Sequence, residues 1–263
     1  MMKRNPGRDE LMAYMSSKVN HIYQRLGIDS LESDTFFDTL LRDLSVGYLC
    51  SFGNPDCTNP AKAKFAEWMS SSDPDEENSN PIDAAVRSTV YCSAVAEGQS
   101  DVWDFLFERY LRGTNGNEKS NILSALGCSS NEETLQRYLA LSMDPDSGIR
   151  KQDGKSVVSS VANNAQGSAI AFRWLDSNWD AIRSYFDTAV SSPLADMVGV
   201  VARSFNTQEE LDGLKIFVQS HQNNLGTAQR ATELAIETTE ANIAWMEDYY
   251  NVIVEWLQGK TQS

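Results

Sequence analysis

Histidine is scarce in this chain, which has only His21 and His221 among its 263 residues. Neither begins the His-Glu-x-x-His pattern, which places two zinc ligands on one helical face with a glutamate base. The chain also lacks the Gly-x-Ser-x-Gly elbow of serine hydrolases and a glycine-rich phosphate loop. Its two turns with calcium-like ligands, DPDSG and NPDC, lack the twelve-residue loop that ends in glutamate. We therefore expect no metal, cofactor or catalytic residue in these 263 residues.

The chain also has few positively charged residues and no long hydrophobic runs. The chain has 22 Lys and Arg against 37 Asp and Glu, for a net charge of −15. Its densest basic stretch, IRKQDGK, is interrupted by an aspartate, so we expect neither a nucleic-acid partner nor attraction to anionic lipid. No apolar run is long enough to cross a bilayer, and neither end shows a secretory signal or a lipid-anchor tail. We expect no direct membrane insertion by this chain.

Four cysteines are present: Cys50, Cys57, Cys92 and Cys128. Four cysteines allow three connectivities. The stretch CSFGNPDC places the first two around a Gly-Asn-Pro-Asp turn, which can bring their sulfurs within bonding reach. Reduced, buried thiols remain an equally open interpretation. A zinc site is disfavoured, because no histidine lies near a cysteine in the sequence and the spacings are not those of structural zinc ligands.

What the chain does have is a succession of helix signals. With 41% apolar residues, 7 Pro and 15 Gly, it is typical of a helix-rich globular protein. We predict Ser100 as an N-cap and Gly113 as the stop of one helix, followed by a helix over about 118–126. Ser130 with Glu133, and Thr207 with Glu210, form capping-box patterns. The sequence SSPLADMV predicts Ser192 as N-cap with Pro193 at the first helical position.

The last stretch, from Gly226 to Gln258, predicts two further helices. One of them carries a stripe of mostly small residues that permits a neighbouring helix to approach closely: Ala231, Leu234, Ala235 and Thr238.

No convincing strand alternation is found. Short connections between helices of roughly 10–15 residues favour antiparallel neighbours. We therefore predict an all-α fold, a superhelical solenoid of stacked antiparallel helix hairpins of the HEAT or armadillo kind with degenerate repeats. The polar stretch 70–81, SSSDPDEENSNP, is expected to be an exposed acidic loop within a single domain that covers residues 1–263.

Five segments in this order resemble the C-terminal domain of zinc aminopeptidases of the aminopeptidase N type, the M1 family. They are RSTVYCSAVAEGQSDVWDFLFERY, NEKSNILSALGCS, LQRYLALSMDPDSGIRKQD, VVSSVANNAQGSAIAFRWLDSNWDAI and GTAQRATELAIETTEANIAW. The resemblance covers about residues 11–257, and the secreted and membrane-anchored ectoenzymes look most similar. In that family the domain is a HEAT-like helical bowl that closes the peptide cavity over a separate catalytic domain, which holds the zinc.

The resemblance carries several implications. It implies the disulfides Cys50–Cys57 and Cys92–Cys128, and a start inside the domain, so that its first helices are absent. It implies the catalytic domain and a peptide substrate as partners, with a homodimer in some members. It also implies an extracellular or cell-surface location as part of a parent protein. The function that follows is a non-catalytic domain that closes the substrate cavity, and we expect this chain alone to hydrolyse nothing.

Four residues match motif positions from which polar side chains of the family project toward the distal part of the peptide. They are Arg150, Gln152, Asn163 and Arg230. An arginine can bind a peptide carboxylate through two hydrogen bonds. The structural alternative is that the two arginines tie adjacent helices together or cap helix carbonyls. Trp174 and Trp179 are expected in the core, and Tyr91 is expected to pack beside a disulfide.

A second function from a different class stays open at this point. The chain could be a stand-alone binding module on which a toxin, a pathogen protein or a partner subunit docks without catalysis. Association with a separated catalytic region is the observation that discriminates between the two functions.

Overall fold

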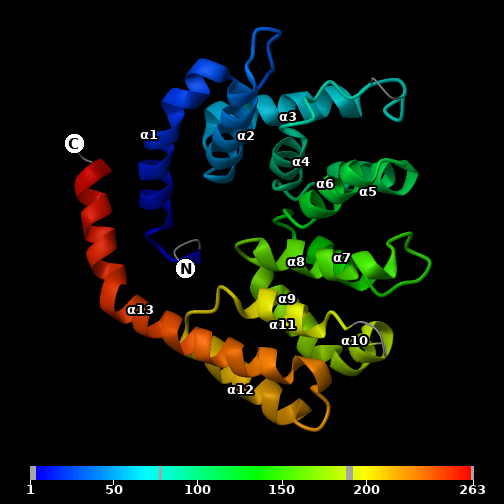
Figure 1. Ribbon diagram of the computed structural model, residues 1–263, viewed down its shortest axis with the longest axis vertical. Coiled ribbons are helices and arrows are strands. Elements are labelled where there is room, and N and C mark those ends of the chain that lie inside the picture. The colour runs from blue at the N-terminus through cyan, green and yellow to red at the C-terminus, as the bar shows by residue number, and fades with distance from the viewer. Residues whose placement is uncertain (1–3, 77–78, 188–191, 262–263) are drawn as a thin grey trace. The chain divides into compact units, whose positions relative to one another are not determined.

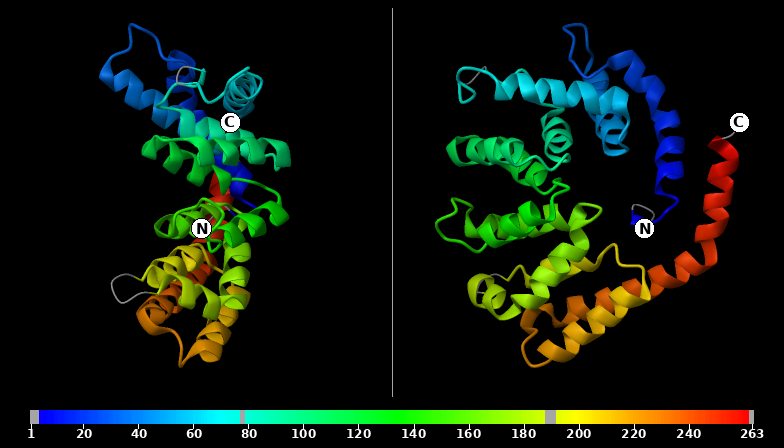
Figure 2. Two further views of the ribbon diagram at one scale, coloured as in Figure 1. Left: turned by 90° about the vertical axis from the view of Figure 1, so that its right-hand side faces the viewer. Right: turned by 180° about the vertical axis from the view of Figure 1, so that it is seen from behind.

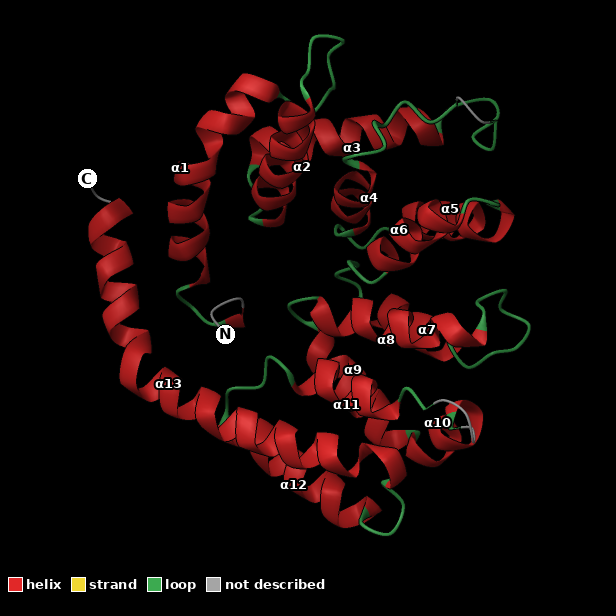
Figure 3. Cartoon of the chain, viewed as in Figure 1, coloured by secondary structure: helices red, strands yellow, loops and turns green. Residues whose placement is uncertain are grey.

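The computed structural model describes residues 4–76, 79–187 and 192–261. Every regular element among them is a helix, and no strand occurs in these ranges (Figure 3). The chain divides into two compact units. The N unit comprises the described residues of Gly7–Asn131 and Leu257–Ser263, and the C unit comprises those of Met1–Pro6 and Glu132–Trp256. The predicted all-α class of stacked helix hairpins is confirmed, whereas the single domain stays a prediction.

The N unit is built from six helices in sequence order (Figure 1). They are α1 (Arg8–Leu26), α2 (Phe36–Ser51), α3 (Pro55–Met69), α4 (Arg87–Val95), α5 (Ser100–Arg112) and α6 (Gly116–Leu126). Helix α2 packs on α1, α3 and α4, while α4 also packs on α6, which forms a short hairpin with α5. At the centre, Trp68 stacks on Tyr91 with ring centroids 5.2 Å apart and meets Phe105 edge-on at 5.2 Å. Aromatic rings therefore hold three of these helices together.

The C unit is also built from packed helices. Its elements are α7 (Glu132–Leu141), η2 (Lys151–Asp153), α8 (Gly154–Asn163), α9 (Gly167–Ser177), α10 (Trp179–Phe186), α11 (Leu194–Ala202), α12 (Gln208–His221), η3 (Gly226–Ala228) and the part of α13 (Gln229–Thr261) that precedes Leu257. Helices α8, α9 and α11 pack on one another, and α13 runs beside α12, where Lys215 pairs with Glu240 (Figure 2). The core again holds aromatic rings: Trp179 meets Phe217 edge-on at 5.1 Å.

Both disulfides lie in the N unit, and they are the two that the resemblance implies. Cys50 of α2 is bonded to Cys57 of α3, with Cα atoms 5.1 Å apart. Cys92 of α4 is bonded to Cys128, which follows α6, with a Cα separation of 5.4 Å. Each bond therefore joins two packed helices or their ends. All four cysteines are thus in disulfides, which decides between the two alternatives that the sequence left open.

Tyr91 is fully buried beside the second disulfide, as predicted. Its hydroxyl donates to Glu118 of α6 and accepts from the Asn80 side-chain amide at 2.6 Å. Burial, and then the negative charge of Glu118, raise the pKa of the Tyr91 hydroxyl far above its usual value. The phenol therefore stays protonated and serves as a fixed hydrogen-bond donor between α4 and α6.

The acidic loop is mostly exposed where the structure describes it, with Glu77 and Asn78 outside the described residues. It is nevertheless attached to the helices beside it. The Trp68 indole donates to the carbonyl of Pro74 at 3.1 Å, and Asp75 pairs with Arg109 and Arg112 of α5, each at 3.2 Å. These contacts explain how a polar insertion of this length can follow α3 without separating it from α5.

Several predicted helix starts are displaced by one residue. Gln99, not Ser100, is the N-cap of α5, and α7 begins at Glu132, so Asn131 precedes it in place of Ser130. Pro193 is the N-cap of α11, one position outside the helix. The capping box of Thr207 with Glu210 is confirmed in both directions. Local cap preferences therefore identify the turn correctly and place the helix start within one residue.

The two helices predicted for the last stretch are wrong. The chain forms the short η3 and then one continuous helix, α13, of 33 residues. No proline occurs within α13, and Gly259 lies in its last turn. Because no helix-ending residue interrupts this stretch, it forms a single helix that is longer than a typical one.

Candidate functional site

An open groove of about 840 Å³ lies within the C unit, lined by α8, α11, η3 and α13. From α8 it receives Lys155, Ser159 and Asn163, which follow one another at intervals of four residues. Side chains at this spacing lie on one face of a helix, so α8 presents three polar groups in a row to the groove. The helix is held in this orientation because its opposite face buries Val157, Val158 and Val161 in the core.

Small residues line the other walls. These are Ala195, Gly199 and Ala202 from α11, and Ala231 and Ala235 from α13. The stripe predicted from the sequence at Ala231, Leu234, Ala235 and Thr238 lines this groove in full. Short side chains leave the space that a larger residue would fill.

Cations outnumber carboxylates along the groove. Lys155 pairs with Asp196 across the groove, Nζ to Oδ2 at 2.9 Å, and Arg230 pairs with Glu233 one turn further along α13 at 3.2 Å. Arg203, at the carboxyl end of α11, is exposed and makes no hydrogen bond or ion pair with the described residues. The groove therefore carries local positive charge in a chain whose net charge is −15. Such a patch attracts an anionic group.

The groove brings together two of the four predicted contact residues. Asn163 and Arg230 line it from α8 and α13. Arg150 and Gln152 are not part of the lining; both are exposed, and Arg150 donates to the carboxylate of Asp153 at 2.6 Å. Arg150 pairs with Asp153 and Arg230 pairs with Glu233, in each case within a single helical turn. A role of these four residues in binding stays a prediction.

Sequence reasoning missed Lys155, Arg203 and Asp196. A signal for Lys155 was present, because it shares a four-residue spacing with Asn163 and belongs to the densest basic stretch. Arg203 had no such signal, since it stands in the turn after α11 and reaches the groove only through the packing of α11 on α8.

The histidines lie apart from the groove. His21 is exposed on α1, and His221 at the end of α12 contacts Asp176 at 3.2 Å with its ring against Phe217. Among the residues that the structure describes, no three His, Cys, Asp or Glu side chains gather to hold a metal ion. In those same ranges, no helix has the length and apolar character needed to cross a membrane. Trp179 is in the core as predicted, while Trp174 is only half-buried.

Comparison with known proteins gives one family match that covers nearly the whole chain. The ERAP1-like C-terminal domain family matches residues 1–241. Among curated proteins, the chain is 34% identical to human (Homo sapiens) aminopeptidase N over 213 residues, which are 81% of this chain and 21% of that protein. It is 34% identical to chicken (Gallus gallus) aminopeptidase Ey over 220 residues, 83% of this chain and 22% of that protein.

A relative with a different name matches over a longer stretch. The mouse (Mus musculus) thyrotropin-releasing hormone-degrading ectoenzyme is 30% identical over 250 residues, which are 93% of this chain and 22% of that protein. The chain therefore spans about a fifth of the length of these curated relatives.

Proposed function

The chain belongs to the family of ERAP1-like C-terminal domains, and from that premise we propose that it is the non-catalytic C-terminal domain of a zinc aminopeptidase. Two relatives are named aminopeptidases, and each is more than four times as long as the matched segment. In this proposal the catalytic domain is the partner of the chain, and the zinc is held there. The chain closes the substrate cavity and contacts the part of the peptide distant from the scissile bond.

The cationic groove is the observation that supports peptide contact most directly. A peptide ends in a carboxylate, and an arginine binds a carboxylate through paired, charge-assisted hydrogen bonds. Arg203 is exposed with no partner among the described residues, and Arg230 is 79% exposed beyond its pair with Glu233, so both are available to an incoming carboxylate. The small side chains of α11 and α13 leave room for the peptide backbone. We assign Arg203 and Arg230 to carboxylate binding, and Asn163 to the neighbouring peptide groups.

The test of this assignment compares two peptides that differ only at their carboxyl end. A fluorescent peptide with a free carboxylate is expected to bind the purified chain roughly ten- to a hundredfold more tightly than its amidated form, the range of one charge-assisted contact. Arg203→Gln combined with Arg230→Gln is expected to abolish that preference, whereas Lys215→Gln on α12, outside the groove lining, preserves it. Equal affinity for the two peptides in fluorescence polarisation would contradict the assignment.

Catalysis and assembly are tested separately. The purified chain is expected to hold no zinc and to release no amino acid from aminoacyl chromogenic substrates. A separately purified catalytic region is expected to bind the chain in a pull-down. Stoichiometric bound zinc together with substrate turnover would overturn the proposal. If the catalytic region does not bind the chain in the pull-down, a stand-alone binding module is favoured.

We also propose an extracellular or cell-surface location for the parent protein. The two disulfides support it, because such bonds persist in oxidising compartments and are rare in the cytosol. One relative is itself named an ectoenzyme.

A further inference from the structure

Helix α2 is apolar on two opposite faces, and only one of them is covered. One face buries Val46, Leu49 and Cys50 in the core of the N unit. The opposite face carries exposed side chains that we name the α2 stripe: Phe36 (73% exposed), Phe37 (72%), Leu40 (44%), Leu44 (54%) and Tyr48 (50%). Elsewhere among the described residues of the N unit, large apolar side chains are exposed only at Leu31, in the connection between α1 and α2, and at Leu111.

The spacing of the stripe indicates what kind of element would cover it. Phe36, Leu40, Leu44 and Tyr48 follow one another at four-residue intervals, so they form a single ridge. Phe36 and Tyr48 are twelve residue steps apart, so this ridge is about 18 Å long. A ridge of this type packs into the groove between side-chain rows of another helix, which makes an amphipathic helix of three to four turns a fitting partner.

The charges beside the stripe add a further requirement. Asp38 pairs with Arg25 and Asp34 pairs with Arg42, so these two carboxylates are already neutralised. Asp43 precedes Leu44 and has no hydrogen bond or ion pair with the described residues. An arriving helix would partly desolvate this carboxylate, which is costly unless a cation accompanies it. The covering helix is therefore expected to place a lysine or arginine against Asp43.

The chain spans about a fifth of the length of its relatives, so most of an aminopeptidase polypeptide lies outside these 263 residues. We propose that the α2 stripe is the docking surface for an amphipathic helix, with a basic residue facing Asp43, that belongs to this remaining part of the parent polypeptide. The inference rests on the proposed function, because it takes the partner from the parent aminopeptidase. It explains why a row of five large apolar side chains is exposed on an otherwise well-packed unit.

Photocrosslinking in the full-length parent enzyme tests the proposal. Phe37 is replaced by the photoreactive benzoylphenylalanine, which retains an aromatic ring at an exposed position. The matched control carries the same group at Ile216, which is 61% exposed on α12. On irradiation, we expect the Phe37 variant to form an adduct within one molecule, to a peptide from outside residues 1–263, and the Ile216 variant to form none with that peptide. Mass spectrometry identifies the peptide joined to the stripe.

Two outcomes overturn the proposal: an adduct between two copies that joins peptides from residues 1–263, and the absence of any adduct at position 37. Leu40→Asp gives a second readout. It is expected to lower the melting temperature of the parent enzyme while leaving that of the isolated chain unchanged, and an equal effect in both would contradict docking. Zinc-dependent aminopeptidase activity is measured in the same preparation. If the parent enzyme shows no activity, the proposed function is contradicted, whereas the crosslinked peptide can still be identified and still tests the docking.

Discussion

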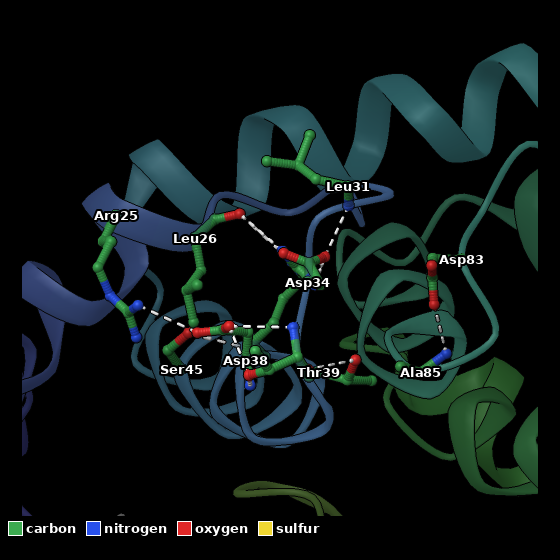
Figure 4. Close-up of polar contacts among 11 residues, drawn as sticks. Arg25, Leu26, Leu31, Asp34, Asp38, Thr39, Ser45, Asp83 and Ala85 are labelled. Atoms are coloured by element: carbon green, nitrogen blue, oxygen red, sulfur yellow. Dashed lines mark hydrogen bonds and ion pairs between the residues drawn. The ribbon is translucent and has the colours of Figure 1, made fainter.

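Arg42 is a charged side chain in the core of the N unit, with only 1% of its surface exposed. Its Nε and Nη2 atoms both donate to the carbonyl of Leu26 at 3.3 Å, and Nη1 pairs with Asp34 at 2.7 Å. Asp34 in turn accepts from the amide of Leu31 (Figure 4). The guanidinium of Arg42 therefore connects α2 to the last carbonyl of α1 and to the turn that follows α1. Burial of such a cation is tolerated because each of its nitrogens has an acceptor.

Replacing Arg42 by methionine is expected to destabilise the chain by about 2–3 kcal/mol, since the carbonyl of Leu26 would remain buried without its charged donor. Urea unfolding followed by circular dichroism measures the change. Arg25→Ala is the matched control, because Arg25 pairs with Asp38 at the surface, where such pairs contribute little. A loss for Arg42→Met no larger than for the control would show that the buried contacts do not stabilise the fold.

Acid sensitivity is predicted at the start of α2. The Thr35 hydroxyl and amide donate to the Asp38 carboxylate, with further help from Arg25, and together they lower the pKa of Asp38. A carboxyl whose pKa is lower in the folded state stabilises fully above its unfolded pKa, near 4, and loses that contribution as the pH falls through its folded pKa. Asp34 behaves alike, because the hydrogen bond from Arg42 lowers its pKa.

Asp38→Asn should therefore flatten the dependence of urea stability on pH below about pH 4, while also lowering stability at neutral pH. Asp248→Asn, on the exposed surface of α13, is the control for the loss of one surface carboxylate. An unchanged acid slope in Asp38→Asn would remove Asp38 from the account of acid sensitivity.

At the scale of elements, close packing of α8 on α9 depends on a glycine. A Cβ built on Gly167 would lie 1.9 Å from the carbonyl oxygen of Val161, far inside contact distance. Gly199 of α11 has the opposite surroundings, with no atom within 4 Å of such a Cβ. Two glycines in neighbouring helices are thus present for different reasons, and only the first is required by packing.

Gly167→Ala is expected to cost about 1–3 kcal/mol, because the α8–α9 turn must open to admit the methyl group. Gly199→Ala is expected to stabilise by about 0.5–1 kcal/mol, because alanine restricts the unfolded chain and favours the helix. Thermal unfolding of the two variants checks the opposite signs. The same sign in both would show that helix propensity, and not the contact with Val161, decides the outcome.

The sequence was most informative about the individual helices. The predicted caps lie within one residue of the starts of the helices at 100–112 and 208–221, because a polar residue directly precedes each helix. The same rules missed the continuity of α13, because no proline or other stop signal interrupts this helix before its last turn. In the groove, Asn163 and Arg230 could be predicted from resemblance. Arg203 could not, because only tertiary packing brings the end of α11 to α8.

At the scale of the whole molecule, the two units are stabilised unequally by covalent bonds, since both disulfides belong to the N unit. In the chain-entropy model, the bond between Cys92 and Cys128, 36 residues apart, contributes about 3–4 kcal/mol. The bond between Cys50 and Cys57, 7 residues apart, contributes less, about 2–3 kcal/mol. The C unit contains no cysteine, so no disulfide contributes to its stability.

Reducing agent is therefore expected to lower the unfolding temperature of the N unit and to leave local protection in the C unit unchanged. Hydrogen exchange with peptide-level mass spectrometry separates the two, with faster exchange in α2–α6 and no change in α8–α11. Intact mass of the untreated protein should show two bonds. Four free thiols in a non-reduced sample, or equal loosening of both units, would contradict this asymmetry.

Each unit also contains a tryptophan in its central aromatic cluster: Trp68 in the N unit and Trp179 in the C unit. The indole of Trp68 donates to Pro74, and that of Trp179 donates to Asn224 at 3.0 Å. When a unit unfolds, its tryptophan ring moves from an apolar, hydrogen-bonded environment into water. The fluorescence emission of that tryptophan then shifts to longer wavelength. Intrinsic fluorescence of Trp→Phe variants can consequently follow the two halves one at a time, without any attached dye.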